Sequence, residues 1–125
     1  RIFVDRDSGN IASINLQNTP YSIPGGNLAG LSVAGGVDFN GDNITDIIIG
    51  LPLDGGAAAG TVKIITDVAS NSFINLTGFA SGQQAGFSLS GLGDFNGDGY
   101  GDFLIGAPDS ASTGDVYVVF GNDSG

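Results

Sequence analysis

The stretch Asp94 to Pro108, DFNGDGYGDFLIGAP, combines three aspartates, one asparagine and four glycines with a run of apolar side chains. The stretch Asp38 to Pro52, DFNGDNITDIIIGLP, carries the same pattern 56 residues earlier in the chain. A pattern of acidic turn residues followed at once by an apolar run, kept over so many positions, indicates a repeated structural unit. The fold therefore has to place a cluster of carboxylates directly before a buried strand.

The repetition extends beyond these two stretches. Gly30 to Pro52 aligns with Gly86 to Pro108 without a gap, and Gly60 to Asp67 aligns with Gly114 to Gly121 at a spacing of 54. Short apolar runs between clusters of Gly, Pro, Asn and Asp predict four short strands in each period. In the complete period we expect strands at Leu31 to Ala34, Asp46 to Leu51, Thr61 to Thr66 and Ser72 to Leu76.

The composition favours strands and turns over helices. The 125 residues include 23 glycines, and all 13 acidic residues are aspartates. The formal net charge of −10 argues against a nucleic-acid partner, and the absence of a long apolar run argues against membrane insertion. Because the chain has no Cys and no His, disulfides, thiolate or imidazole catalysis and the usual zinc ligand sets are excluded. The remaining hard oxygen ligands suit a cation.

The second predicted strand of each period decides the fold class. Ile47 to Ile49, and likewise Phe103 to Ile105, run apolar without alternation, which is typical of a strand covered on both faces. Gly50 and Gly106 follow these runs and would allow another backbone to approach closely. Four strands in each period fit either a propeller blade or a repeat of a β-sandwich, and a second strand covered on both faces favours the blade. We therefore predict an all-β fold of β-propeller blades, each with four antiparallel strands, in which the chain forms about two blades of a partial propeller.

The acidic loop has the spacing of a calcium site. Numbered from its first aspartate, each loop has oxygen-bearing side chains at positions 1, 3, 5 and 9. In a tight turn such alternate side chains can converge on one point. The backbone carbonyl at position 7 can join them as a further ligand. Calcium takes about six to eight oxygen ligands in irregular geometry. We expect two Ca²⁺ sites, held by Asp38, Asn40, Asp42, the Ile44 carbonyl and Asp46, and by Asp94, Asn96, Asp98, the Tyr100 carbonyl and Asp102.

Other positions of the loop support this interpretation. Without a cation, two carboxylates about 4 Å apart repel each other by about 4 kcal/mol at an effective dielectric constant of 20. Asn43 and Gly99 at position 6 are residues that readily adopt a left-handed backbone conformation. Phe39 and Phe95 at position 2 are expected to point away from the ion into the core.

Two alternatives share part of this pattern. An EF-hand opens with the same aspartate and asparagine spacing, but it needs a bidentate Glu at position 12 and a helix after it. This chain has Ile49 and Ile105 there, within apolar runs that predict strands. The second alternative is a turn in which Asp and Asn side chains bind only their own backbone and no ion.

The residues resemble the FG-GAP repeats of the integrin α-subunit type of β-propeller. The two motifs that name this family correspond to Gly86 to Ser88 and Gly106 to Pro108, with GLS and GLP in the other copy. The resemblance implies a calcium loop between the first and second strands of each blade. It suggests that residues 1–20 form strands three and four of a preceding or shared blade. Residues 21–79 then form a complete blade with its calcium loop at 38–46. Residues 80–125 form a blade without its outer strand, with its calcium loop at 94–102.

The resemblance also implies a function. We expect a calcium-stabilised, non-enzymatic scaffold for adhesion or protein interaction, secreted or displayed at the cell surface, whose ligand is a protein or a glycan. The alternatives are a carbohydrate-binding, lectin-like propeller and the non-catalytic part of a larger secreted enzyme. Because a blade buries its faces only against neighbouring blades, we also expect self-association into a ring or association with the rest of a longer propeller.

A catalytic role has one weak candidate. Asp7-Ser8-Gly9 and Asp123-Ser124-Gly125 repeat the triplet that aspartic proteases carry twice, where two carboxylates share one proton. In those enzymes the triplets lie on apolar strands, whereas here one follows Arg6 and the other ends the sequence. No catalytic residue is therefore predicted.

Overall fold

The computed structural model describes residues 3–4, 11–12, 28–67, 72–109 and 113–123. These residues form nine strands and no helix, so the prediction of an all-β chain is confirmed. Within the described ranges there is accordingly no helix of the length and apolarity needed to cross a membrane. The strands are β1 (Phe3–Val4), β2 (Ile11–Ala12), β3 (Val33–Val37), β4 (Asp46–Leu51), β5 (Thr61–Asp67), β6 (Ser72–Leu76), β7 (Ser88–Gly93), β8 (Asp102–Ala107) and β9 (Asp115–Val119).

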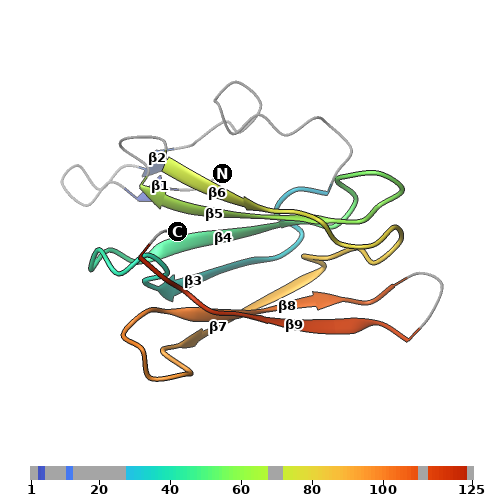
Figure 1. The fold of residues 1–125 in the computed structure, drawn as a ribbon. Helices are drawn as coiled ribbons and strands as arrows, with labels where there is room; N and C mark the ends of the chain where they lie inside the picture. The colour runs from blue at the N-terminus through green and yellow to red at the C-terminus, as the bar shows by residue number, and fades with distance from the viewer. Residues whose placement is uncertain (1–2, 5–10, 13–27, 68–71, 110–112, 124–125) are drawn as a thin grey trace.

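Each repeat forms one antiparallel sheet in which neighbours in sequence are neighbours in space. The first repeat is a four-stranded sheet with the order β3-β4-β5-β6, and the second is a three-stranded sheet with the order β7-β8-β9 (Figure 1). These are the strand counts expected of one complete blade and of one blade that lacks its outer strand. Most of the segment 1–20, where two further strands were expected, lies outside the described residues, except that β1 pairs with β2.

The first strand of the complete sheet differs from its predicted position. It was expected at Leu31 to Ala34, but β3 runs from Val33 to Val37. The Gly35-Gly36 pair indicated the end of a strand, yet it forms an irregularity in the pairing between Ala34 and Val37, and Gly36 adopts a φ of 80°. A glycine tolerates this left-handed conformation, so the strand bends and continues to pair with β4.

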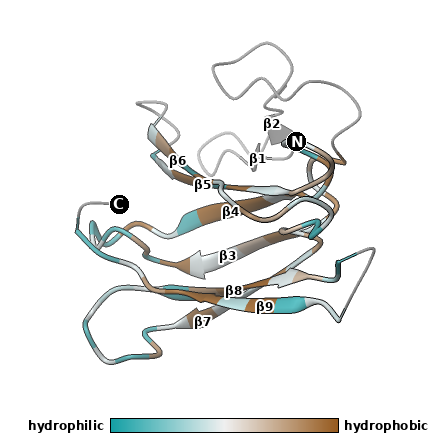
Figure 2. Cartoon of the chain, turned by 45° about the vertical axis from the view of Figure 1, so that its right-hand side comes forward, coloured by the Kyte–Doolittle hydropathy of each residue, from teal (hydrophilic) through white to brown (hydrophobic). Residues whose placement is uncertain are grey.

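The core lies between the two sheets, which stack face to face (Figures 1 and 2). The Phe103 side chain of β8 is fully buried there, and its ring centroid lies 5.6 Å from that of Phe39. Apolar side chains of both sheets surround this pair. They include Val37, Ile48, Val62 and Ile64 from the first repeat and Ala85, Ile105 and Ala107 from the second.

Strand β4 is apolar on both of its faces, as predicted. Ile48 points toward the second repeat and belongs to the core between the sheets. Its neighbours Ile49 and Leu51 are also buried, but they form a separate cluster with Ile65 on the opposite face of the same sheet. Because side chains alternate between the two faces of a strand, a run that is apolar throughout must be covered on both sides.

A close backbone contact joins the two repeats at one end of the sheets. A Cβ atom at Gly50 would collide with the carbonyl oxygen of Gly86 and with the hydroxyl of Ser32, which itself donates a hydrogen bond of 2.6 Å to that oxygen. Gly60 of the first repeat and Ala85 of the second repeat also form an isolated parallel β-bridge. The expectation that Gly50 permits a close backbone approach is therefore confirmed.

We predict that Gly50→Ala destabilises the fold by about 2 to 3 kcal/mol, because backbone atoms of the second repeat cannot move away without separating the sheets. Urea unfolding followed by circular dichroism measures the change. The matched control is Gly56→Ala, where a Cβ atom would meet no atom within 4 Å. Equal unfolding free energies for the two variants would contradict this account of the contact.

Candidate metal centre

The first acidic loop joins β3 to β4 and is organised by the carboxylate of Asp38. Its Oδ1 accepts hydrogen bonds from the backbone amides of Gly41 (2.7 Å) and Asp42 (3.0 Å). Its Oδ2 accepts one from the amide of Asn43 (2.8 Å), which has the predicted left-handed φ of 65°. Three amides directed at one carboxylate hold the loop in a tight turn.

The second loop, between β7 and β8, repeats this turn almost bond for bond. Asp94 accepts from the amides of Gly97 (2.8 Å) and Asp98 (3.0 Å) through Oδ1 and from Gly99 (2.8 Å) through Oδ2. Gly99 has a φ of 92°, so position 6 is left-handed in both loops. The repeated sequence therefore produces a repeated backbone, with Asn and Gly equivalent at this position.

The side chains at positions 3 and 5 also bind one another and the loop backbone. In the first loop Asn40 Nδ2 donates to Asp42 Oδ2 (3.1 Å), and Asp42 Oδ1 accepts from the amide of Ile44 (2.8 Å). In the second loop the equivalent bonds to Asp98 come from the Tyr100 amide and the Asn96 side chain, and they lower the pKa of Asp98.

The aspartate at position 9 of the first loop is the most unusual group in this part of the molecule. Asp46 is 1 % exposed. Its Oδ2 accepts a hydrogen bond of 2.7 Å from the amide of Phe39, but its buried Oδ1 has no hydrogen-bond partner within the part of the chain that the structure describes. Burial raises the pKa of Asp46 to about 6, and the nearby charges of Asp42 and Asp38 add to the increase.

The equivalent Asp102 has a different environment. Its Oδ2 accepts from the amides of Phe95 (2.7 Å) and Asn96 (3.3 Å), while its Oδ1 accepts from the amide of Gly121 (2.9 Å). The position equivalent to Gly121 in the first repeat is Asp67. The two loops therefore share a backbone but not the hydrogen bonding of their last carboxylate.

Each predicted ligand set lies within a single loop, but the acidic side chains are not drawn together around one point. In the residues that the structure describes, no three acidic side chains are close enough to form a metal cluster. Both loops have the hydrogen bonds of the ion-free Asx turn that the sequence left as an alternative. The role of these residues as ligands remains a prediction.

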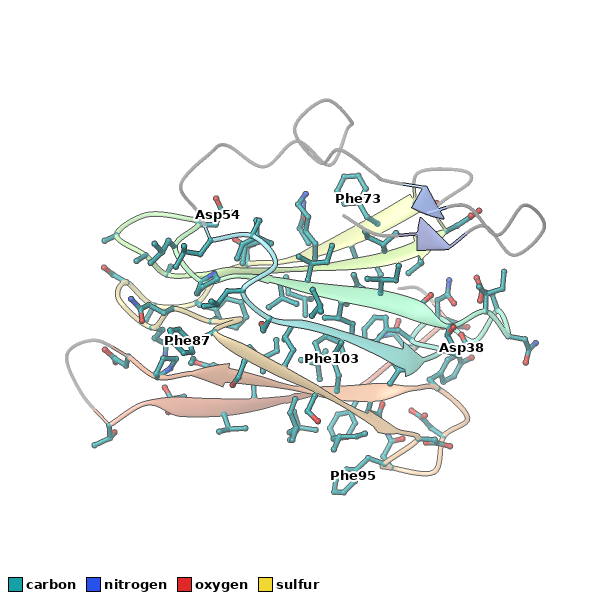
Figure 3. All side chains as sticks on the ribbon, turned by 180° about the vertical axis from the view of Figure 1, so that it is seen from behind. Asp38, Asp54, Phe73, Phe87, Phe95 and Phe103 are labelled. Atoms are coloured by element: carbon teal, nitrogen blue, oxygen red, sulfur yellow. The ribbon has the colours of Figure 1, made fainter. Side chains whose placement is uncertain are left out.

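The expectation for the phenylalanines at position 2 is right for one loop and wrong for the other. Phe39 is 3 % exposed and packs against Phe103, whereas Phe95 is 67 % exposed. Figure 3 shows Phe95 pointing away from the sheets while Phe103 lies between them. The reason is the position of the repeat: Phe39 faces the second sheet, whereas the described residues provide no sheet opposite Phe95.

The two loops are connected by contacts that the spacing of the repeat did not reveal. The amide of Gly101 donates to the carbonyl of Asp38 (2.6 Å), and the amide of Asn122 donates to the carbonyl of Phe39 (3.0 Å). The Tyr100 ring lies where a side chain on Gly41 would be. The backbone of the first loop is therefore supported by residues beside the second loop.

Comparison with known sequences agrees with this architecture. The FG-GAP repeat family model matches residues 29–65 and 85–119, which are the two repeats described above. The chain belongs to the FG-GAP repeat family. The matched residues include both acidic loops and the strands on either side of them.

Relatives with FG-GAP repeats similar to this chain are integrin α subunits. The chain is 35 % identical to mouse integrin alpha-E over 125 aligned positions, which cover 89 % of this chain and 11 % of the relative. It is 34 % identical to chicken integrin alpha-V, with 96 % of this chain and 13 % of the relative covered. For Drosophila melanogaster integrin alpha-PS5 the identity is 34 %, over 70 % of this chain and 9 % of the relative. The chain thus spans about a tenth of the length of these relatives.

We predict that the stability of these FG-GAP repeats in a chelator falls as the pH rises through about 6. The folded state holds the Asp46 proton more tightly than the unfolded chain, whose aspartates titrate near 3.9, so the stabilisation is complete below about pH 4 and is lost through about pH 6. The lowered pKa of Asp98 changes the stability only at pH values below this range, where aspartates of the unfolded chain become protonated. The expected loss is about 2 kcal/mol.

Urea unfolding at several pH values between about 4.5 and 7.5 measures this slope. The matched variant is Asp46→Asn, which keeps the shape of the side chain and cannot ionise. A slope that survives unchanged in Asp46→Asn would show that another group causes it.

Proposed function

We propose that this chain is a calcium-binding FG-GAP β-propeller module that acts outside the cell as a non-enzymatic scaffold for adhesion or protein recognition. The observation that carries the proposal is the buried Oδ1 of Asp46, for which the described residues provide no hydrogen-bond donor. A buried carboxylate oxygen without a donor is costly unless a cation or a proton neutralises it.

The donor set of each loop suits a hard cation. The first loop would supply oxygens from Asp38, Asn40, Asp42, the Ile44 carbonyl and Asp46, and the second loop would supply the equivalent set. A carboxylate has about four lone-pair positions, so an oxygen that accepts an amide hydrogen bond can still bind an ion. Calcium accepts this number of oxygens in flexible geometry, whereas magnesium demands a regular octahedron and retains water.

Calcium would serve the fold rather than a reaction. Each loop lies between the first two strands of its sheet, and the first loop also contacts the second repeat through the Asp38 carbonyl. An ion there would offset the repulsion between carboxylates that the turn gathers. Extracellular calcium modules bind with dissociation constants of about 0.1 to 1 mM, so calcium outside cells would keep such sites at least partly filled.

The proposal of a scaffold without catalysis is supported by the relatives and by the residue types that the sequence contains. The relatives that align over most of the chain are integrin α subunits. The chain has no His and no Cys, which are frequent general bases and nucleophiles in enzymes. No role is proposed for the Asp7-Ser8-Gly9 triplet, which lies outside the described residues. We propose that the partner, a protein or a glycan, binds to loops, because loops vary most easily between proteins that share a propeller scaffold.

We predict that calcium raises the stability of the chain and that two ions bind. A site filled at 100 times its dissociation constant contributes about 2.7 kcal/mol to the free energy of unfolding. Asp42→Asn and Asp98→Asn each remove one carboxylate charge from one loop and should each reduce the stoichiometry in isothermal titration from two ions to one. The double variant should show no calcium-dependent change in melting temperature.

The matched control is Asp123→Asn, which removes the same charge from an exposed position outside both loops. It should bind two ions as the parent chain does. If chelation leaves the melting temperature of the parent chain unchanged, or if Asp123→Asn weakens binding as much as the loop variants, the proposed calcium sites do not exist.

A further inference from the structure

Both acidic loops lie at the same end of the stacked sheets, and one peptide group connects them (Figure 1). The carbonyl of this peptide belongs to Tyr100 and is the predicted backbone ligand of the second loop. Its amide belongs to Gly101 and donates a hydrogen bond of 2.6 Å to the carbonyl of Asp38, where the first loop begins. Because a trans peptide directs its C=O and its N–H to opposite sides, this group can act as a ligand in one loop and support the backbone of the other.

A second link between the loops runs through the segment that follows β9. The Gly121 amide donates to Oδ1 of Asp102 (2.9 Å), the last carboxylate of the second loop. The next amide, that of Asn122, donates to the Phe39 carbonyl (3.0 Å). The Phe39 amide in turn donates to Oδ2 of Asp46 (2.7 Å), the last carboxylate of the first loop. Two consecutive amides of one segment therefore connect the last predicted ligand of each loop.

The backbone atoms at this junction are closely packed. Gly101 and Gly121 are both buried. A Cβ atom on Gly101 would lie 2.7 Å from the amide nitrogen of Asp38 and 2.9 Å from Cβ of Val37. A Cβ atom on Gly121 would lie 2.5 Å from the carbonyl oxygens of Gly101 and Phe39. Since close-packed atoms leave no space to move into, a shift of one loop backbone displaces the other.

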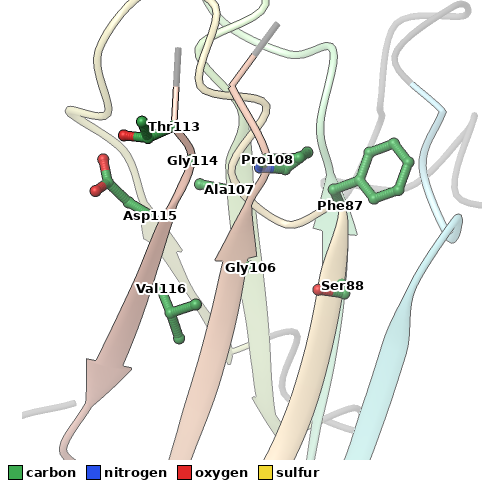
Figure 4. Close-up of a pocket in the computed structure, with 9 residues that line it drawn as sticks. All are labelled: Phe87, Ser88, Gly106, Ala107, Pro108, Thr113, Gly114, Asp115 and Val116. Carbon is green, nitrogen blue, oxygen red and sulfur yellow. The ribbon is translucent and has the colours of Figure 1, made fainter.

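The opposite end of the sheets is separated from the loops by the length of the strands. Strand β8 begins at Asp102, beside the loops, and ends at Ala107, where Figure 4 shows a hollow of about 460 Å³ between the ends of β7, β8 and β9. Ala85, which precedes β7 near this end, is fully buried, and its amide donates to the Ala59 carbonyl (3.0 Å). The Ala85 amide can therefore serve as a reference for changes that spread through the whole fold.

Charge alone would make the two loops oppose one another. Each loop has three aspartates and no Lys or Arg, so a bound Ca²⁺ changes its formal charge from −3 to −1 and makes the neighbouring loop less attractive to a second ion. This effect is screened, because Asp42, Asp94 and Asp98 are exposed and the Debye length is about 8 Å at physiological ionic strength. The contacts through Gly101 and Gly121 are buried and are screened much less.

The peptide contacts couple the loops in the favourable direction. A Tyr100 carbonyl that is held as a ligand fixes the orientation of its peptide, and the Gly101 amide is then fixed on the Asp38 carbonyl. The first loop consequently loses less conformational freedom when it binds its own ion, which strengthens that binding. Polarisation of the shared peptide adds to this effect, because hydrogen bonds in a chain strengthen one another.

We propose that the two acidic loops bind calcium cooperatively, so that occupation of either loop strengthens binding in the other through the Tyr100-Gly101 peptide and the amides of Gly121 and Asn122. This inference rests on the proposed calcium function and adds the regulation of one site by the other. Because a coupling free energy is reciprocal, each loop strengthens the other by the same factor. Gly101, Gly121 and Asn122 are positioning residues, since none of them is a predicted ligand.

A calcium titration followed by ¹⁵N–¹H NMR resolves the two loops. The amides of Asn43 and Gly99 report on the first and the second loop, because each donates to the first aspartate of its own loop. Asp98→Asn, which disables the second loop, should raise the calcium midpoint of Asn43, and Asp42→Asn should raise that of Gly99. The product of the two shifts equals the coupling factor whichever loop fills first, and it should be at least about five.

The charge effect predicts the reverse. An Asp98→Asn loop without an ion keeps two negative charges, whereas the parent loop with its ion keeps one, so charge alone would tighten binding in the first loop. Asp123→Asn, outside both loops, is the control and should leave both midpoints within about twofold of the parent values. Two bound ions with a product of about one or less would overturn the coupling and leave the calcium function standing. A chain that binds no calcium would overturn both.

Asn122→Pro tests the route, because proline has no amide to donate to the Phe39 carbonyl. Asn122 is exposed and follows Gly121, a residue that readily adopts the conformations allowed before proline. The product of the two shifts, measured again in this background, should fall by about half or more. Asn122→Ala keeps the amide and should keep the product. Equal products in the two backgrounds would exclude the link through Asn122.

Hydrogen exchange in Asp42→Asn gives a readout that depends on neither the affinity of the first loop nor the proline variant. Calcium can then load only the second loop, yet it should slow exchange of the Phe39 amide in the first loop. The slowing should exceed that of the Ala85 reference amide by at least about twofold, because the effect passes through the contact between the loops. Equal slowing at Phe39 and Ala85 would show that calcium stabilises the fold as a whole and would contradict the proposed route.

Discussion

The stacking of two sheets that are apolar on both faces is the constraint on which the rest of this structure depends. Phe103, Ile48 and Ile64 are fully buried only because one sheet covers the other. A sheet of this kind cannot be stable alone in water, since burying one face leaves the other exposed. The same property that joins the two repeats leaves Val116 and Phe95 exposed at the next face of the stack.

The acidic loops take their shape from local bonds and their environment from the stack. Asp38 and Asp94 each collect three backbone amides from their own loop, which needs no neighbouring sheet. Asp46 is different, because its burial and its unpartnered oxygen arise where the loop meets the core. Burial of a carboxylate disfavours its charged form unless a cation or a proton neutralises it.

Much of this arrangement could be predicted from the repeat. The doubled acidic pattern indicated two equivalent loops, and the apolar runs located β4 and β8 because a strand covered on both faces needs no polar alternation. The limits of β3 could not be predicted in this way, since Gly35 and Gly36 look the same in a turn and in a bulge. Gln83 was also missed: its side chain donates to Asp115 (2.6 Å) and accepts from Tyr117 (3.0 Å), which are distant in sequence.

The sequence by itself determined the strand order within each repeat, the left-handed turns at Asn43 and Gly99 and the oxygen-rich chemistry of both loops. These follow from side-chain type and spacing within a few residues, where local sterics and hydrogen bonds decide the outcome. Only the tertiary structure decided that Phe39 is buried and Phe95 exposed. It also decided that Oδ1 of Asp102 accepts from the Gly121 amide, whereas Oδ1 of Asp46 has no hydrogen-bond partner among the described residues. Identical local patterns differ there because burial depends on which surface lies opposite, and repeats with the same sequence can have different neighbours.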